Sequence, residues 1–314
     1  MCMKRNDDIN YTRTILILLV ILVHIVPFTI LHPQLKAAIL SFMMPTFLLI
    51  TGYLVNINKS LRKFSIYYLG ILVPYVVMSV AYSVVSYYMP VRDGIHELSA
   101  SVILDKVLVT SIGPYWFLHT MLICGLLYYV CFAIPLHKEY KIERLIVFGI
   151  SLLLLSLFTP LQSLKISLFY FIGVLLRQTD CDFDKVFYKS PLSLIPFCIL
   201  VSNKSFYDWG LITVIAMAYC FISFSSWLYG YIKDKKVNKY VILVGMNTFP
   251  IYIFHPVFTM AAKFYKPWLA FDASGWLLAI VTIIIAISGS LVMAWILDKT
   301  KTCYLLGKES ILRL

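Results

Sequence analysis

The sequence has little charge for its length: only 13% of its 314 residues are Asp, Glu, Lys or Arg, whereas 61% are hydrophobic. In a soluble domain about 25% of residues are charged. The mean hydropathy of +0.86 and repeated apolar stretches of spanning length instead predict an integral membrane protein in the lipid bilayer. The net charge of +12 does not indicate a nucleic-acid partner, because the cations form short clusters between apolar stretches rather than one basic face.

Carboxylates are absent from the interior of the apolar stretches. All fifteen Asp and Glu residues lie near the chain ends, in loops or close to the edges of the stretches. Ion-coupled carriers commonly relay protons or sodium ions through buried carboxylates. Their absence counts against an ion-coupled carrier, but not against a flippase or a facilitator.

Sequence motifs for several other chemistries are missing. The chain has no Walker-type loop, no GxGxxG and no GxSxG, so ATP-driven transport, dinucleotide chemistry and serine hydrolysis lose support. Its seven cysteines form no CxxC or zinc pattern, and no metal is expected. No linker, internal repeat or low-complexity tract breaks the chain, which predicts a single membrane domain over residues 1–314.

The apolar stretches predict an all-α bundle of about ten transmembrane helices. With the N-terminus in the cytoplasm, twenty of the 27 Lys and Arg residues fall in the segments that face inward. This alternation predicts that both termini are cytoplasmic. Within the bundle, Gly52 and Gly173 indicate close helix packing. The predicted spans are residues 14–31, 37–55, 66–89, 115–134, 145–159, 163–176, 191–202, 209–232, 240–264 and 274–297.

Two ionisable residues mark the first predicted span, which we interpret as a retained helix rather than a signal peptide. Arg13 precedes this span and His24 lies near its middle, with ten residues between them. On an α-helix, eleven steps return the side chain to within about 20° of the same face, about 16.5 Å further along the axis. Ionisable groups are expensive inside a membrane, so this stripe is a candidate functional site. A neutral, partly desolvated imidazole is a competent general base for a hydroxyl, which makes His24 the candidate base.

Two further histidines, His119 and His255, lie toward the outer ends of predicted spans. Each candidate also has a structural interpretation. A lone membrane histidine often forms hydrogen bonds between helices, and Arg13 by itself is typical of a snorkelling topology anchor. Tyr115 and Trp116 are typical of an interfacial aromatic belt. These alternatives remain open at the level of single residues.

Taken together, the residues resemble the acyltransferase-3 family of bacterial membrane acyltransferases. The Arg13–x10–His24 pair looks like the characteristic motif of that family. Residues 42–53 are similar to its Phe-Pro-Phe-Ser-Gly pattern, and further matching segments are residues 114–118, 170–173 and 245–255. The matches occur in family order and cover nearly the whole chain.

The sequence departs from the family pattern at several positions. Thr51 and Thr248 stand where serine is usual, and the Trp-Ser-Leu-x-x-Glu form is absent after Trp116. No extra hydrolase-like domain is expected after the last predicted helix. These departures bear on the identity of the acceptor, and on any relay of the acyl group in two steps, more than on the transfer activity itself. The chain looks like the compact, stand-alone branch that modifies surface sugars.

The resemblance implies acyl transfer, usually of acetyl, from cytoplasmic acetyl-CoA to a hydroxyl of a cell-surface glycan, a lipid-linked sugar or a related envelope molecule at the inner membrane of a bacterium. Arg13, with Lys4 and Arg5 nearby, is expected to bind the phosphates of coenzyme A. His24 is expected to be the base that activates the acceptor hydroxyl. The residues expected to line the acceptor side, by hydrogen bonds and sugar stacking, are Tyr115, Trp116, His119, Asn247 and His255.

Two other classes of function stay open. A transporter or flippase for a lipid-linked sugar would use the basic and aromatic residues to line a path. A glycan polymerase or ligase is also multi-pass and dependent on His and Arg, but commonly carries a large outer catalytic loop, for which residues 90–114 are rather few. Only the acyltransferase is expected to bind coenzyme A.

Overall fold

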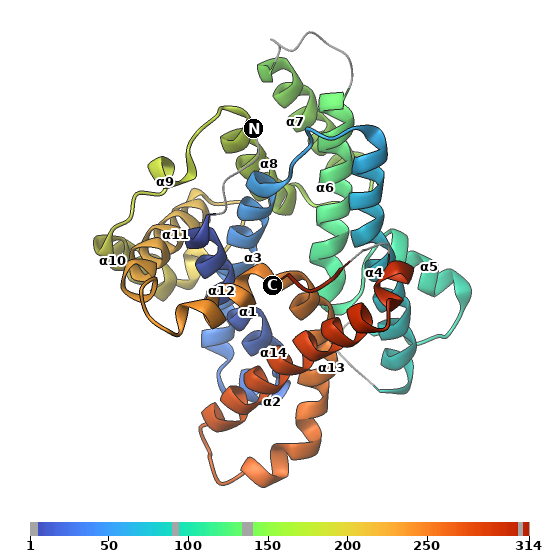
Figure 1. Cartoon of the computed structure of the whole chain (residues 1–314), viewed down its shortest axis with the longest axis vertical. Helices are drawn as coiled ribbons and strands as arrows, with labels where there is room; N and C mark the ends of the chain where they lie inside the picture. Colours follow the sequence, from blue (N-terminus) through green and yellow to red (C-terminus); the bar gives the residue numbers. More distant parts are fainter. Residues whose placement is uncertain (1–5, 90–93, 134–140, 307–309, 314) are drawn as a thin grey trace. The chain divides into compact units, whose positions relative to one another are not determined.

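The computed structural model describes residues 6–89, 94–133, 141–306 and 310–313, and these residues form helices joined by short connections, without a β-strand (Figure 1). The α-helices are α1 (Asp7–His24), α2 (Val26–Leu31), α3 (Pro33–Leu54), α4 (Leu61–Tyr88), α5 (Ala100–Leu108), α6 (Trp116–Ala133), α7 (Lys141–Phe158), α8 (Leu164–Gln178), α9 (Phe183–Val186), α10 (Leu194–Ser202), α11 (Ile212–Ile232), α12 (Asn238–Met246), α13 (Thr248–Tyr265) and α14 (Trp276–Lys299). The 3-10 helices are η1 (Gly113–Tyr115), η2 (Pro191–Ser193), η3 (Lys204–Phe206), η4 (Lys266–Leu269) and η5 (Thr302–Leu306).

The all-helical membrane architecture expected from composition is confirmed. Among the described residues, five helices are long and apolar enough to cross a membrane, and a sixth is added if the bent pair of α12 and α13 counts as one span. The five are Pro33–Leu54, Leu61–Tyr88, Ala100–Ala133, Ile212–Ile232 and Trp276–Lys299, and the third of these contains α5, η1 and α6. Helices α1, α7 and α8 are shorter or more polar, with 18, 18 and 15 residues. The count of ten spans and the cytoplasmic termini stay predictions.

The first predicted span, residues 14–31, is broken rather than continuous. Helix α1 ends at His24, Ile25 has an extended backbone with φ −80° and ψ 90°, and α2 begins at Val26. Pro27 accounts for the break, because proline has no N–H for the carbonyl four residues earlier and its ring clashes with that carbonyl. His24 is therefore the last residue of a helix rather than a residue in the middle of one.

The ninth predicted span is also broken. Helix α12 ends at Met246, α13 begins at Thr248, and the two helices meet at an angle of 85°. We call this corner, residues 246–248, the elbow. Asn247 lies at its centre and is fully buried. Its Nδ2 donates to the carbonyl oxygen of Leu243 at 2.8 Å, in the last turn of α12, so the side chain helps to close the end of that helix.

The chain divides into two compact units, and the first boundary along the sequence falls inside α3. Unit 1 consists of Met1–Phe47, Asp182–Thr302 and Ser310–Leu314, and unit 2 consists of Leu48–Cys181 and Cys303–Glu309. The expectation of one domain over residues 1–314 stays a prediction.

Helix α1 is central to unit 1, where it packs against α11, α12, α13 and α14. A Cβ added to Gly245 of α12 would lie 2.0 Å from the carbonyl oxygen of Asn10, so only glycine allows this close approach to α1. The hydroxyl of Thr14 fixes the same crossing by donating to the carbonyl oxygen of Val241 at 2.7 Å. The helix that carries Arg13 and His24 is thus held directly against the elbow.

Unit 2 packs the last turns of α3 against α8 through two glycines. A Cβ on Gly52 would lie 2.2 Å from the carbonyl oxygen of Tyr170, and a Cβ on Gly173 would lie 2.0 Å from that of Leu49. The close helix packing predicted for Gly52 and Gly173 is confirmed. The ring of Tyr170 continues into a buried apolar core that α6, α7 and α8 share.

Candidate active site

Arg13 and His24 both lie on α1, as the sequence predicted. The helix begins where the side chain of Asn6 accepts the backbone N–H of Ile9 at 3.1 Å, an N-cap that satisfies one of the unpaired donors of the first turn. From there α1 runs without a break to His24. An uninterrupted helix separates the two residues by about 16.5 Å along its axis.

The ring of His24 is oriented by its own helix. Its Nδ1 lies 2.7 Å from the carbonyl oxygen of Val20, one turn earlier. A carbonyl only accepts, so a neutral ring carries its proton on Nδ1 and its lone pair on Nε2. The side chain is half-buried, and it stands at the C-terminal end of α1, where the helix dipole favours a positive charge. These are the properties of a group that can accept a proton through Nε2.

His255 is oriented in the same way from α13. Its Nδ1 lies 2.8 Å from the carbonyl oxygen of Tyr252 and 3.2 Å from that of Ile251. The next residue, Pro256, explains why the Tyr252 carbonyl is available, because proline has no N–H to donate to it. The histidine is fully buried, and its Nε2 has no hydrogen-bond partner among the described residues.

The two rings form a pair. Their centroids lie 5.1 Å apart and their planes meet at 71°. In both neutral rings the Nδ1 proton is directed to a backbone carbonyl, so both lone pairs lie on Nε2. A buried polar atom without a hydrogen-bond partner destabilises the protein relative to one that is hydrogen-bonded. A ligand with a hydroxyl would supply the partner that the Nε2 of His255 lacks.

Arg13 joins α1 to the elbow. Its guanidinium donates a hydrogen bond to the hydroxyl of Thr248, the first residue of α13. The neighbouring Asn247, predicted to bind the acceptor, uses its amide inside the protein. Its Nδ2 donates to the carbonyl oxygen of Arg313 at 2.7 Å, and its Oδ1 accepts the backbone N–H of Arg313 at 2.7 Å. The acceptor role of Asn247 and the donor role of Arg13 stay predictions.

Lys4 and Arg5, the other two residues predicted to bind coenzyme A, lie outside the described residues.

His119 belongs to unit 2, where it has a structural partner. Its Nε2 lies 3.1 Å from the carbonyl oxygen of Leu108, the last residue of α5. The hydroxyl of Tyr75 donates to the preceding carbonyl, that of Val107, at 2.7 Å. The last carbonyls of a helix have no partner within it, so His119 and Tyr75 together cap α5. A role of His119 toward the acceptor stays a prediction.

Tyr115 and Trp116 also belong to unit 2, at the junction of η1 and α6. Tyr115 is fully buried and packs edge-on against Tyr82, with 5.7 Å between ring centroids and 84° between ring planes. Trp116 is half-buried. Burial distinguishes Tyr115 from the half-exposed residues of an interfacial belt, and the predicted stacking of either ring on a sugar is still a prediction.

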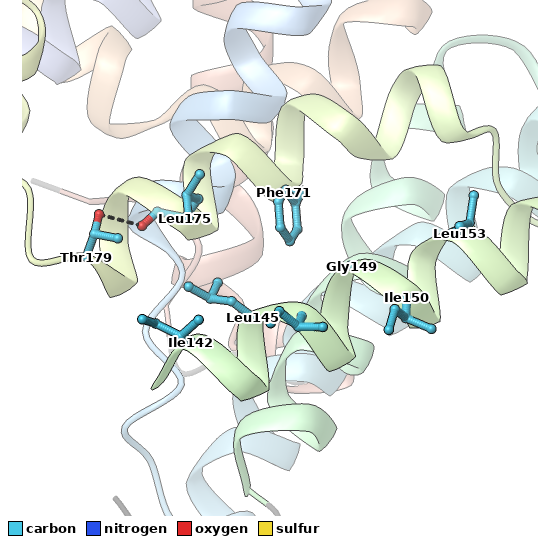
Figure 2. Close-up of a pocket in the computed structure, with 9 residues that line it drawn as sticks. Ile142, Leu145, Gly149, Ile150, Leu153, Phe171, Leu175 and Thr179 are labelled. Atoms are coloured by element: carbon cyan, nitrogen blue, oxygen red, sulfur yellow. Dashed lines mark hydrogen bonds between the residues drawn. The ribbon is translucent and has the colours of Figure 1, made fainter. Parts of the chain in front are cut away.

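A separate groove of about 430 Å³ lies between α7 and α8 in unit 2. Leu145, Gly149, Leu153, Phe171 and Leu175 form most of its lining (Figure 2). The one polar side chain of the lining, Thr179, donates to the carbonyl oxygen of Leu175 at 2.8 Å. Among the described residues, the lining includes no group for acid–base chemistry, so the groove is not the candidate active site.

Sequence reasoning missed three features of unit 1: the pairing of His24 with His255, the bond from Arg13 to Thr248, and the engagement of Asn247 by Arg313. Each joins residues that are at least 66 positions apart. Pro27 and Pro256 were the available signals, because a proline inside a predicted span marks either a break or a released carbonyl. Among the described residues, no group of three or more His, Cys, Asp or Glu side chains is placed to hold a metal ion.

Helices of membrane-spanning length and a histidine pair define a multi-pass membrane protein with a candidate acid–base site. The sequence matches the acyltransferase domain of the acyltransferase-3 family over residues 6–295, nearly the whole chain. The protein therefore belongs to this family, and the resemblance seen in the sequence is confirmed. Family and architecture together make it a membrane acyltransferase. No curated protein and no solved structure matches the chain.

Proposed function

We propose that the protein transfers an acetyl group from cytoplasmic acetyl-CoA to a hydroxyl of a cell-surface glycan, a lipid-linked sugar or a related envelope molecule. Its place would be the inner membrane of a bacterium, as a bundle of about ten helices with both termini in the cytoplasm. This topology would deliver the soluble donor to the inner end of α1, where Arg13 lies, and the acceptor toward His24.

The histidine pair carries the proposal. The rings of His24 and His255 lie 5.1 Å apart, and the fully buried Nε2 of His255 has no hydrogen-bond partner among the described residues. A hydroxyl bound between the rings can donate to one Nε2 only, and the lone pair on the other then accepts a hydrogen bond from a second hydroxyl of the acceptor or from the imidazolium that forms. We assign the base to His24, because it is half-buried and stands at the end of a helix that favours its protonated form.

The reaction balances with one proton relay. The acceptor oxygen attacks the thioester carbonyl carbon while the Nε2 of His24 takes the hydroxyl proton. The C–S bond then breaks, and the coenzyme A thiolate leaves and recovers that proton from the imidazolium. The net reaction forms one ester and one free thiol, and no other reactant is needed. In this scheme the carbonyl oxygen of Val20 orients the ring of His24 through its hydrogen bond with Nδ1, so that Nε2 faces the acceptor.

The remaining predicted residues bind the two substrates. Arg13, with Lys4 and Arg5, would hold the phosphates of coenzyme A, since a guanidinium forms paired hydrogen bonds to phosphate oxygens. The long pantetheine arm would then reach along α1 toward His24. The acceptor would contact the second group, Tyr115, Trp116, His119, Asn247 and His255.

The test is release of coenzyme A thiol by the purified protein in nanodiscs, with and without an envelope-glycan extract. Wild-type protein is expected to release thiol when the extract is present. His24→Ala should abolish this release while the protein stays folded and inserted, whereas His96→Ala, an exposed histidine of unit 2, should match wild type.

Two results would contradict the proposal. Wild-type activity in the His24→Ala variant would remove the assigned base. Failure of the folded wild-type protein to bind coenzyme A would reject acyl-CoA chemistry and favour a transporter or flippase for a lipid-linked sugar.

A further inference from the structure

Residues 310–313, which we call the strap, are bound to the rest of unit 1 by two polar side chains. The carboxylate of Asp298, in the last turn of α14, accepts the backbone N–H of Ile311 at 2.7 Å and that of Leu312 at 2.9 Å. It also accepts the hydroxyl of Ser310 at 3.0 Å. One carboxylate thus fixes three successive residues of the strap.

The second attachment is at the elbow. The buried amide of Asn247 pairs with both backbone groups of Arg313, donating to its carbonyl oxygen and accepting its N–H, each at 2.7 Å. This two-point bond resembles one rung of a β-ladder and sets the direction of the backbone at Arg313. The side chain of Arg313 remains exposed, so the strap is held by its backbone while its cation faces outward.

The elbow brings a second arginine to the same place. Asn247 holds Arg313, and the next residue, Thr248, accepts a hydrogen bond from the guanidinium of Arg13. Consecutive Cα atoms are about 3.8 Å apart. Two arginines that are 300 positions apart in the chain are therefore anchored on neighbouring residues of one buried corner.

We propose that the strap completes the acyl-donor site, and that Arg13 and Arg313 together bind the phosphates of coenzyme A. This inference rests on the proposed function and adds a binding residue to it. Coenzyme A carries a diphosphate and a 3′-phosphate, and two arginines anchored at one corner match several anionic groups better than one does. Asp298 then positions Arg313 through the backbone of the strap, and Asn247 does so in addition to its proposed contact with the acceptor.

The charged groups near the strap agree with this assignment. The carboxylate of Asp298 accepts three hydrogen bonds from the strap itself. Near the start of α1, Asp8 forms an ion pair with Lys189 at 2.8 Å, and Asp7 accepts a hydrogen bond from Asn10 at 3.1 Å. These carboxylates are thus engaged with other groups of unit 1.

The test compares apparent KM for acetyl-CoA with kcat in nanodiscs. Arg313→Gln is expected to raise KM about tenfold and to leave kcat within about twofold, because a charged hydrogen bond to phosphate is lost while the chemistry is untouched. Arg313→Lys should recover part of the affinity. Lys235→Gln, which removes an exposed cation in the connection between α11 and α12, should match wild type.

A donor without phosphates shows whether the effect of Arg313 depends on the phosphates of coenzyme A. With S-acetylpantetheine, Arg313→Gln and wild type should turn over equally. Asp298→Asn keeps Arg313 but weakens its anchor, and should raise the KM for acetyl-CoA less than Arg313→Gln does.

An unchanged KM in Arg313→Gln, an equal rise in Lys235→Gln, or an equal loss with S-acetylpantetheine would overturn the strap assignment and leave the acyltransferase proposal intact. A wild-type protein that neither binds coenzyme A nor turns over acetyl-CoA would overturn both.

Discussion

The histidines of the two units differ in the ring nitrogen that the protein occupies. In unit 1, His24 and His255 each place Nδ1 against a carbonyl of their own helix, and the lone pairs lie on Nε2. In unit 2, His119 places Nε2 against the carbonyl of Leu108, at the end of another helix. The first arrangement leaves the outer nitrogen for a ligand, whereas the second uses it to cap α5. Location in a predicted membrane span does not by itself distinguish a histidine that acts as a base from one that forms a structural hydrogen bond.

After the abolition of transfer expected for His24→Ala, the largest effect is expected at His255, the fully buried member of the pair. His255→Asn keeps a side-chain amide near the position of Nδ1 but removes the Nε2 acceptor. We expect kcat to fall about 100-fold, the scale of one acid–base contact, with little change in thermal stability. A rate within threefold of wild type would show that His255 is only a packing residue.

A smaller loss should follow from moving the elbow without touching a histidine. Gly245→Ala places a methyl group against the carbonyl oxygen of Asn10, where the Cβ would lie 2.0 Å away, so α12 must shift relative to α1. Overpacking of this kind destabilises by about 1–3 kcal/mol, and we expect roughly a tenfold lower kcat/KM.

Gly230→Ala is the matched control for that variant. A Cβ at Gly230 of α11 would meet no described atom within 4 Å other than those of its own stretch of helix, so the change should stabilise the helix by about 0.5–1 kcal/mol and leave turnover as it is. Equal behaviour of the two variants in thermal unfolding and turnover would contradict the packing argument.

His119→Gln separates the two roles of His119. Glutamine can still donate to the Leu108 carbonyl from a position near that of Nε2, so α5 should keep its cap and the protein its stability. If His119 also faces the acceptor, as we propose, the KM for the acceptor should rise about threefold, the loss of one neutral hydrogen bond. No change in this KM would restrict His119 to the cap.

The smallest effect on turnover is expected at Tyr75. Tyr75→Phe removes the companion bond to the Val107 carbonyl and should lower stability by about 1 kcal/mol, measured by thermal unfolding. Transfer activity should not change. A loss of activity would indicate that the end of α5 contributes to the site.

Much of the fold follows from local pattern. The ten apolar stretches correspond to helical segments among the described residues, because stretches of that length and composition form helices in a membrane. The placement of Arg13 and His24 on one helix follows from a spacing of eleven residues and the period of the α-helix. Gly52 and Gly173 were identified as packing residues because they lack a side chain.

The rest depends on contacts that local pattern does not encode. The break after His24 follows from Pro27, but the sequence does not distinguish a break from a kink. Nothing near Asn247 indicates that its amide pairs with Arg313, because the interaction depends on how the strap returns to the elbow. The pairing of His24 with His255 likewise requires the crossing of α1 and α13.

The most direct test of the central claim, that His24 and His255 act as one unit on the acceptor, is a double-mutant cycle on kcat. Transfer of radiolabelled acetyl from acetyl-CoA would be measured for wild type, His24→Asn, His255→Asn and the double variant. Residues that act as a unit give non-additive losses. The account predicts that the double variant is about as slow as His24→Asn alone. Losses that multiply would show that the two histidines act independently, and would contradict it.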